Sequence, residues 1–213
     1  LPSSPLPLAG GVGGGPVSRG ETLAALARPG NQVADVPAFF GLQAFGRVPA
    51  MLNFSTGALN MAAACVAAQI STIVTSRRFI EAGEMEETLK ILSERRRVIY
   101  LEDLRSSLGL SDKLYGLWAS RFPKSALRSA GANRDANAAA VILFTSGSEG
   151  VPKGVVLSHR NLNANRNQAA ARIAFTAQDV VFNALPMFHA FGLTVGSLLT
   201  VLSGVRTFLY PSP

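Results

Sequence analysis

The chain alternates short apolar, β-branched runs with longer stretches of high helical propensity, and this order constrains its fold more than any other feature. Runs of strand character occur at 47–52, 71–76, 98–103, 138–143, 154–159, 180–186 and 205–211. Helical patterns lie between them at 55–70, 77–96, 104–121, 159–173 and 190–204. Such alternation is typical of parallel strands covered by helices. The sequence therefore predicts an α/β fold with mixed, largely parallel sheets covered by helices.

Composition and charge agree with a globular chain and exclude some functions. Hydrophobic residues make up 48% and charged residues 15% of the 213 residues, which is enough apolar material for a core. The net charge is +7, but the basic residues are scattered. The densest run, 95–97, closes a helical pattern, where cations are favoured. Since aromatic and basic residues do not interleave, we expect no nucleic-acid partner.

Two apolar segments stand out in the sequence. Val180–Val205 contains no charged residue and is long enough to cross a bilayer. Asn183, Pro186 and His189 interrupt it, however, and it is interpreted as buried α/β core. Cys65 is the single cysteine and lies in an alanine-rich stretch, so it is expected to be a small buried residue in a reducing compartment.

The stretch "FTSGSEGVPKGVV" (144–156) carries the strongest chemical signal in the sequence. An apolar strand leads into a loop that is rich in glycine and hydroxyl groups and that ends in Lys153. A polyphosphate is bound by closely spaced backbone N–H groups, short hydroxyl donors and a cation, and glycine permits the close approach. The loop therefore indicates phosphate binding.

Two other interpretations of this loop must be weighed. A Walker A loop requires G-x-x-x-x-G-K-[ST] between a strand and a helix. Here Gly154 follows Lys153, no Ser or Thr comes next, and a strand follows, so this is not a Walker A loop. A plain β-hairpin uses the same turn residues. The loop alone therefore leaves phosphate binding and a structural turn open.

The longer stretch "FTSGSEGVPKGVVLSHRNL" (144–162) resembles the phosphate-binding signature of the adenylate-forming (AMP-binding) superfamily. "ALPMFHAFGL" (184–193) resembles the next landmark of that family, in which a histidine follows an aromatic residue. The resemblance implies an incomplete N-terminal portion of an adenylate-forming domain. It also implies that ATP and Mg²⁺ are the cofactors, with the metal ligands expected beyond residue 213.

By this resemblance, individual residues receive roles. Lys153 and His189 are the candidate catalytic residues, with His189 lining the acyl pocket as a positioning group rather than a general base. His159, at a predicted helix start, is interpreted as structural. The candidate nucleotide-binding residues are Thr145, Ser146, Gly147, Ser148, Glu149, Gly150, Lys153 and Gly154.

Glu149 departs from the family pattern, which has threonine at this position. A carboxylate about 4 Å from a phosphate charge costs on the order of 4 kcal/mol at an effective dielectric of 20. Glu149 is therefore expected to point away, to pair with a cation, or to lie near the metal. The S-E-G form resembles the acyl-acyl-carrier-protein synthetase half of the bifunctional 2-acylglycerophosphoethanolamine acyltransferases, as do residues 46–54, 72–81, 98–105 and 203–213.

This resemblance implies an enzyme that joins a fatty acid to ATP, releases pyrophosphate from an acyl-adenylate, and transfers the acyl group to the thiol of an acyl carrier protein. The alternatives are an acyl-CoA synthetase of the same superfamily, with coenzyme A as acceptor, and a non-catalytic nucleotide-binding fragment. The expected substrate is a long-chain fatty acid. Peripheral membrane association and a homo-oligomer are left open, and the expected location is the cytoplasm or the cytoplasmic face of the inner membrane.

The sequence predicts two segments. Residues 1–36 begin with a Pro/Gly/Ser-rich stretch that lacks the pattern of a signal peptide, and they are interpreted as a linker or ragged N-terminal segment. Residues 37–213 are interpreted as a partial AMP-binding domain whose C-terminal domain is absent. Because the family's metal-binding and distal lysine residues would follow residue 213, the chain alone is expected to be inactive.

Overall fold

The computed structural model describes residues 22–25, 32–130, 135–145, 152–176 and 178–210. Its main feature is a six-stranded sheet with the strand order β4-β3-β1-β2-β5-β6. All neighbouring strands in it are parallel except β6, which runs antiparallel to β5. The strands are β1 (Thr22–Ala25), β2 (Val48–Met51), β3 (Thr72–Thr75), β4 (Arg97–Tyr100), β5 (Ala139–Thr145) and β6 (Lys153–Ser158). The predicted fold class is confirmed.

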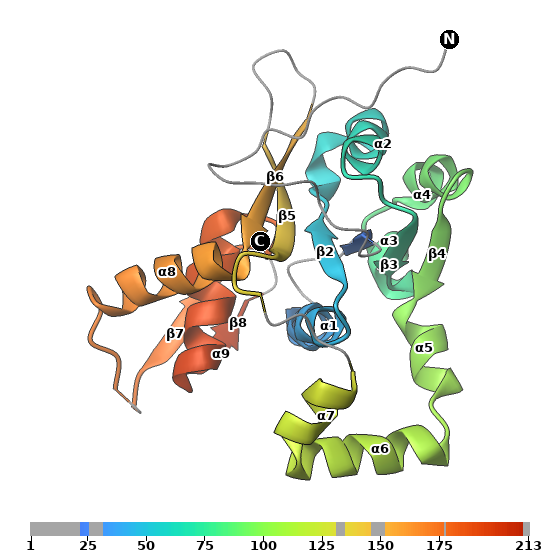
Figure 1. Cartoon of the computed structure of the whole chain (residues 1–213). Coiled ribbons are helices and arrows are strands. Elements are labelled where there is room, and N and C mark those ends of the chain that lie inside the picture. Colours follow the sequence, from blue (N-terminus) through green and yellow to red (C-terminus); the bar gives the residue numbers. More distant parts are fainter. Residues whose placement is uncertain (1–21, 26–31, 131–134, 146–151, 177, 211–213) are drawn as a thin grey trace.

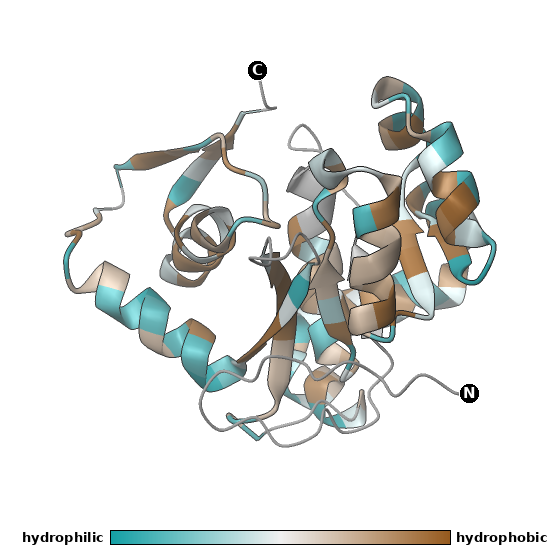
Figure 2. Ribbon diagram, turned by 90° about the horizontal axis from the view of Figure 1, so that it is seen from above, coloured by the Kyte–Doolittle hydropathy of each residue, from teal (hydrophilic) through white to brown (hydrophobic). Residues whose placement is uncertain are grey.

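Helices cover both faces of this sheet. In Figure 2 brown, apolar residues are frequent in its strands, whereas the outer helix α8 is largely teal. The flanking helices are α1 (Gln32–Ala44), the short η2 (Phe54–Thr56), α2 (Ala58–Ala67), α3 (Arg77–Ala82), α4 (Glu86–Ser93) and α8 (His159–Ala170). One apolar cluster joins β2 and β3 to α2, α3 and α4. A second cluster joins β2 and β5 to α1, α8 and the 192–199 helix. Burial on both faces is typical of parallel sheets.

Strand β5 supplies side chains to both clusters. Ile142 belongs to the first cluster, and Val141 and Leu143 belong to the second, as the two-residue period of a strand requires. Ala140 also belongs to the second cluster, because the pairing with β6 shifts register between Ala139 and Val141. This irregularity fits a β-bulge, in which one strand carries an extra residue.

A separate two-stranded parallel sheet follows α8. It consists of β7 (Val180–Asn183) and β8 (Arg206–Leu209), joined by a π-helical segment, η3 (Gly192–Leu199), and by α9 (Thr200–Ser203). In η3 the Ser197 hydroxyl donates to the carbonyl oxygen of Gly192 at 3.0 Å. Gly196 lies against the buried Asn183 side chain so closely that a Cβ atom would overlap it. Glycine is therefore required where η3 crosses β7.

Three helices form an arm that leaves the sheet after β4. They are α5 (Leu101–Ser107), α6 (Leu110–Arg121) and α7 (Pro123–Ser129), and Figure 1 shows α6 and α7 lying apart from both sheets. No residue of these three helices is buried. The described contacts of the arm with the sheet lie where α5 follows β4.

The structure corrects the predicted segment boundary at residue 36. β1 lies within residues 1–36 and pairs with both β2 and β3 in the middle of the sheet, and α1 begins at Gln32. The linker interpretation is therefore wrong for residues 22–25 and 32–36. The strand was missed because "TLAA" carries a single β-branched residue, and its position between two paired strands outweighs its weak propensity.

Two further elements differ from their predicted form. The helix predicted over 77–96 is divided into α3 and α4, because Glu84 has a positive φ of 49° and the chain turns there to bury Met85. The strand predicted over 98–103 ends at Tyr100, and its acidic residues open α5 instead. Acidic residues are favoured in the first turn of a helix.

The basic run 95–97 behaves as predicted for a helix end. The guanidinium of Arg96 donates to the carbonyl oxygen of Leu92 at 3.4 Å and to that of Ala62 at 3.3 Å. It therefore caps the C-terminal part of α4 and reaches α2. Over the described ranges, none of the helices has the length and apolar character that crossing a membrane would need.

Candidate active site

The β5–β6 hairpin brings two predicted site residues together. Thr145 and Lys153 are opposite each other in the antiparallel register, at the last position of β5 and the first of β6. Both are exposed, whereas Gly154, which pairs with Phe144, is buried. The open end of the hairpin at the Thr145–Lys153 pair is named here the hairpin mouth. Because β5 is parallel to β2, the hairpin mouth lies at the carboxyl edge of the sheet, where open α/β sheets bind ligands.

The two strands extend closer to the loop than the sequence predicts. We expected the first strand to end at Leu143 and the second to begin at Gly154, but β5 continues to Thr145 and β6 begins at Lys153. Cross-strand pairing of backbone groups holds these residues in the ladder. The side chains of Thr145 and Lys153 therefore project from a rigid sheet rather than from a free loop.

The remaining loop candidates are Ser146, Gly147, Ser148, Glu149 and Gly150, and they lie outside the described residues. Their predicted roles, and the expected placement of Glu149, stay predictions. Lys153 has no ion-pair partner among the carboxylates of the described chain. Its charge is therefore available to an anion at the mouth of the hairpin.

His189 occupies the turn before η3. It is exposed, and its ring lies 5.0 Å from the ring of Phe188, centroid to centroid. Phe188 in turn packs edge-on against Phe54 at 5.5 Å, and Phe54 opens η2, three residues after the end of β2. Since β2 and β5 are neighbours, this aromatic contact brings the His189 turn to the carboxyl edge of the same sheet. No described contact joins His189 to Thr145 or Lys153.

His159 begins α8 immediately after the N-cap Ser158, whose hydroxyl accepts from the backbone N–H of Asn161 at 3.2 Å. The backbone N–H of His159 donates to the carbonyl oxygen of Ala138 at 3.2 Å. Partial burial lowers the pKa of the imidazole below its usual value. These contacts support the structural interpretation of His159.

The carboxyl edge also holds polar groups that the sequence interpretation missed. Thr75, the last residue of β3, is fully buried, and the structure describes no hydrogen-bond partner for its hydroxyl. Ser76 accepts from the backbone N–H of Phe79 and caps α3. The signal for both was a pair of hydroxyl residues at a strand end, which also fits an ordinary helix start.

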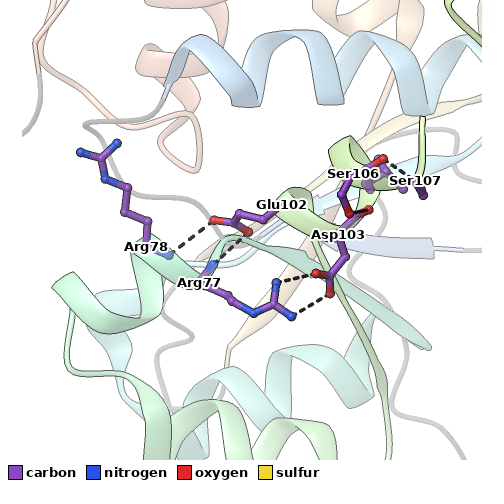
Figure 3. Close-up of polar contacts among 7 residues, drawn as sticks. Arg77, Arg78, Glu102, Asp103, Ser106 and Ser107 are labelled. Atoms are coloured by element: carbon purple, nitrogen blue, oxygen red, sulfur yellow. Dashed lines mark hydrogen bonds and ion pairs between the residues drawn. The ribbon is translucent and has the colours of Figure 1, made fainter. Parts of the chain in front are cut away.

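A polar network joins the start of α3 to the first turn of α5, which is the base of the arm (Figure 3). The guanidinium of Arg77 binds the Asp103 carboxylate through two hydrogen bonds of 2.6 and 2.8 Å and lies 4.1 Å from the centroid of the Tyr100 ring. The Glu102 carboxylate accepts from the backbone N–H groups of Arg77 at 3.1 Å and Arg78 at 3.5 Å.

These contacts shift the acidities of the groups involved. The hydrogen bond from Arg77 lowers the pKa of Asp103. Desolvation opposes ionisation of Glu102, but backbone hydrogen bonds, including those from Arg77 and Arg78, outweigh it and lower the pKa of that carboxyl. Because the Arg77–Asp103 pair is exposed, it contributes little to global stability. Its effect is to fix the direction in which α5 leaves the sheet.

The described residues contain no group of three or more His, Cys, Asp or Glu side chains that could hold a metal ion. The carboxylates of the Arg77 network are engaged with cations and backbone N–H groups. Within the described part of the chain, the site therefore offers a hydroxyl and a cation for an anionic ligand, but no metal cage.

Comparisons with known proteins place this architecture. A family model described as "AMP-binding enzyme" matches residues 17–213. The chain is 43% identical to a long-chain-fatty-acid–CoA ligase of Yersinia pestis over 77 residues, which are 35% of this chain and 14% of that protein. It is 44% identical to a medium-chain fatty-acid–CoA ligase of Escherichia coli over 70 residues, which are 33% of this chain and 12% of that protein.

Solved structures share the fold. O-succinylbenzoate coenzyme A synthetase of Bacillus subtilis, in complex with AMP, superposes with a TM-score of 0.70 at 20% identity, over 92% of this chain and 45% of that one. ATP-bound MatB of Rhodopseudomonas palustris gives a TM-score of 0.63 at 24% identity, over 93% of this chain and 36% of that one. The chain thus spans less than half the length of these solved chains.

Fold and site together define an α/β domain with a glycine- and hydroxyl-rich hairpin at the carboxyl edge of a mostly parallel sheet. The family model covers all but the first 16 residues. The chain belongs to the AMP-binding enzyme family.

Proposed function

We propose that the chain is part of an ATP-dependent ligase that activates a fatty acid as its acyl-adenylate and then passes the acyl group to a thiol. One observation carries this proposal: the hairpin mouth presents Thr145 and Lys153 side by side at the carboxyl edge of the sheet. Family membership and the fatty-acid ligases among its relatives support it. Because the chain spans only part of those proteins, the activity is proposed for the natural full-length protein.

Lys153 would hold the phosphates that leave as pyrophosphate. Its ammonium is exposed, and no carboxylate of the described chain neutralises it. Thr145 lies opposite and supplies a hydroxyl donor to the same space. Ser146, Gly147, Ser148, Glu149, Gly150 and Gly154 complete the proposed nucleotide-binding set. Positioning and charge stabilisation supply most of the catalysis in transfers of this kind.

The described residues fit the phosphates of ATP but not a magnesium ion. An exposed hydroxyl and an unneutralised cation fit the phosphates of ATP, and solved neighbours of the same fold bind AMP, or ATP with magnesium ion. No described cluster fits Mg²⁺. We therefore propose ATP and Mg²⁺ as cofactors, with the metal ligands supplied by other parts of the protein.

His189 is proposed as a positioning residue near the acyl group. The contact from Phe188 to Phe54 brings its turn to the edge where the hairpin opens. Its exposure, and the lack of a described acidic partner, do not suit a general base that must be oriented by a third group. We expect it to affect substrate binding more than the intrinsic rate.

Two acceptors remain as candidates for the second step. The S-E-G form of the loop resembles the carrier-protein synthetases, and this favours the thiol of an acyl carrier protein. The named relatives are CoA ligases, and this favours coenzyme A. Supplying the full-length protein with each acceptor, ATP, magnesium and a long-chain fatty acid, and then measuring the thioester formed, distinguishes them.

ATP–pyrophosphate exchange tests the first step. Lys153→Met removes a charge-assisted contact worth about 1.5–3 kcal/mol, and the exchange rate should therefore fall about 10- to 150-fold. Lys90→Met is the matched control, since Lys90 is an exposed lysine of α4 outside the proposed site and its loss should leave exchange unchanged. Equal exchange in the Lys153→Met variant and the unmodified protein would remove Lys153 from the mechanism.

A further inference from the structure

The arm leaves an unusual amount of apolar side chain in contact with solvent. The exposed fraction of its large apolar residues reaches 74% at Leu110 and is still 40% at Trp118. Single exposed apolar residues are ordinary, but a continuous group of them marks an interaction surface. The group, named here the arm surface, consists of Leu104, Leu108, Leu110, Leu114, Tyr115, Leu117, Trp118, Phe122 and Leu127.

Helical geometry places four of these residues on one side of α6. Leu110, Leu114, Leu117 and Trp118 follow the spacing of three and four residues that forms a stripe along a helix. Ring contacts continue the stripe, with Trp118 lying 5.6 Å from Tyr115 and 6.3 Å from Phe122, centroid to centroid. Tryptophan and tyrosine combine an apolar body with a polar edge, which suits the boundary between lipid and water.

The charges beside this stripe are mainly positive. Between residues 110 and 129 the arm carries four basic side chains against the single acidic Asp112, a difference of four minus one, or +3. Asp112 is already engaged, because its carboxylate accepts from the backbone N–H of Gly109 at 2.8 Å. All four basic residues are exposed: Lys113, Arg121, Lys124 and Arg128.

The direction of the arm is fixed at its base. Arg77, Glu102 and Asp103 tie the first turn of α5 to the start of α3, as Figure 3 shows. Beyond that point α6 and α7 lie apart from both sheets in Figure 1. The arm surface is therefore exposed to solvent, and the contacts of Arg77 with Glu102 and Asp103 fix the direction of the arm.

We propose that the arm surface binds the surface of an anionic phospholipid bilayer, with the stripe of α6 inserted among the headgroups and the basic residues contacting lipid phosphates. Charge complementarity selects this occupant over a second copy of the chain. A symmetric pair would bring four basic side chains toward their own copies, whereas lipid phosphates neutralise them. An apolar face flanked by Lys and Arg is typical of helices that lie in the membrane interface. The inference goes beyond the proposed ligase reaction and stands on the arm alone.

Vesicle flotation with the natural full-length protein tests this proposal. The protein should float with vesicles that contain phosphatidylglycerol and much less with vesicles of phosphatidylcholine alone. Leu114→Glu with Leu117→Glu should weaken this binding by at least about tenfold, because it removes two inserted side chains. The matched control, Leu59→Glu with Val66→Glu, changes two exposed residues of α2, 81% and 70% accessible, and should bind normally.

A charge variant provides an independent test that leaves the apolar stripe intact. Lys124→Gln with Arg128→Gln should weaken binding to anionic vesicles about 25-fold at low salt, since each basic residue near such a surface is worth about fivefold. High salt should likewise weaken the binding of the unmodified protein to anionic vesicles, because salt screens the attraction between its basic residues and the lipid phosphates. Circular dichroism confirms that each variant is folded.

Fluorescence locates the contact. The emission of Trp118, taken as the difference between the unmodified protein and the Trp118→Phe variant, should shift to shorter wavelength when anionic vesicles are added. Unchanged flotation in both arm variants overturns the proposal. Failure of the unmodified protein to bind vesicles also overturns it. In that case sedimentation velocity shows whether the unmodified protein self-associates and whether the arm variants become monomeric. ATP–pyrophosphate exchange is measured separately, so loss of ligase activity cannot be mistaken for loss of membrane binding.

Discussion

The two sheets of the molecule contain similar apolar residues but bury them to different extents. In the six-stranded sheet Ile73 and Val141 are fully buried, because helices cover both faces. In the two-stranded sheet Phe182 is 62% and Phe208 is 55% exposed, although their rings stack at 5.9 Å. Figure 1 shows the smaller sheet beside α8 and α9.

The difference shows that strand composition does not determine how much a strand stabilises the fold. A two-stranded sheet is marginal in water unless another element packs against it. Here η3 packs on β7 and α9 packs on β8. The rings of Phe182, Phe208 and Tyr210, named here the aromatic face, stay exposed. Core substitutions should therefore have large effects in the first sheet and small ones on the aromatic face of the second.

The largest effect is expected at Ile73, in the middle of β3. Ile73→Ala removes a fully buried side chain and should lower the free energy of unfolding by about 3–4 kcal/mol, measured by urea denaturation. Phe182→Ala is the control from the other sheet, and it should cost less than about 1 kcal/mol. Equal losses in the two variants would show that the aromatic face is covered in solution.

Cysteine reactivity should give the next largest contrast. Burial raises the pKa of the Cys65 thiol to about 11, while nearby Arg96 opposes this only partly. At pH 8 alkylation of Cys65 should therefore be at least about a hundredfold slower than that of a cysteine introduced by Phe182→Cys. Timed labelling with iodoacetamide and mass spectrometry of the two peptides measures the ratio. Comparable rates would mean that the first cluster opens readily.

A smaller effect is expected where η3 crosses β7. Gly196→Ala forces a Cβ atom against Asn183 and should destabilise the protein by about 1–3 kcal/mol. Gly116 in α6 is the matched control, because a Cβ atom there meets nothing within 4 Å. Gly116→Ala should raise stability by up to about 1 kcal/mol, since alanine favours a helix. Thermal unfolding of the two variants should shift in opposite directions.

The smallest effect concerns pH and His159, at the junction of β6 and α8. Its pKa is lowered by burial in the folded protein, so the unfolded chain binds the proton more readily. Stability should therefore fall as pH drops below the ordinary histidine range near 6.5, and His159→Gln should reduce that dependence. Denaturant midpoints at pH 5.5 and 7.5 provide the measurement. An unchanged pH dependence would show that the imidazole is equally solvated in both states.

Much of this fold could be predicted from local pattern. The runs at 71–76 and 180–186 and the N-cap Ser158 appear in the structure as β3, β7 and the start of α8. Periodicity and capping are properties of neighbouring residues, and a sequence displays them directly. The strand β1 could not be found this way, because its four residues have little β propensity and its pairing with β2 and β3 depends on segments distant in the sequence.

The sequence predicted the identity of the candidate site residues but not their arrangement, because the arrangement depends on contacts between distant segments. Lys153 and Thr145 stand out because glycine and hydroxyl residues gather around them in sequence. Their direct opposition depends on the register of β5 and β6, which the loop sequence does not determine. The ion pair between Arg77 and Asp103 joins residues 26 positions apart. In the sequence these two residues resemble ordinary charged surface residues, and only the pairing of β3 with β4 brings them together.

The position of β5 has a consequence for how the protein is made. Ala50 in β2 pairs with Ile142 in β5, so the two strands are separated by 92 residues, and the arm lies within that interval. A ribosome adds about 5–20 residues per second, so β2 waits about 5–20 s for its neighbour. During that time β2 has an unpaired edge, which invites pairing with other chains. The nascent protein is therefore most vulnerable to misassembly before the hairpin emerges.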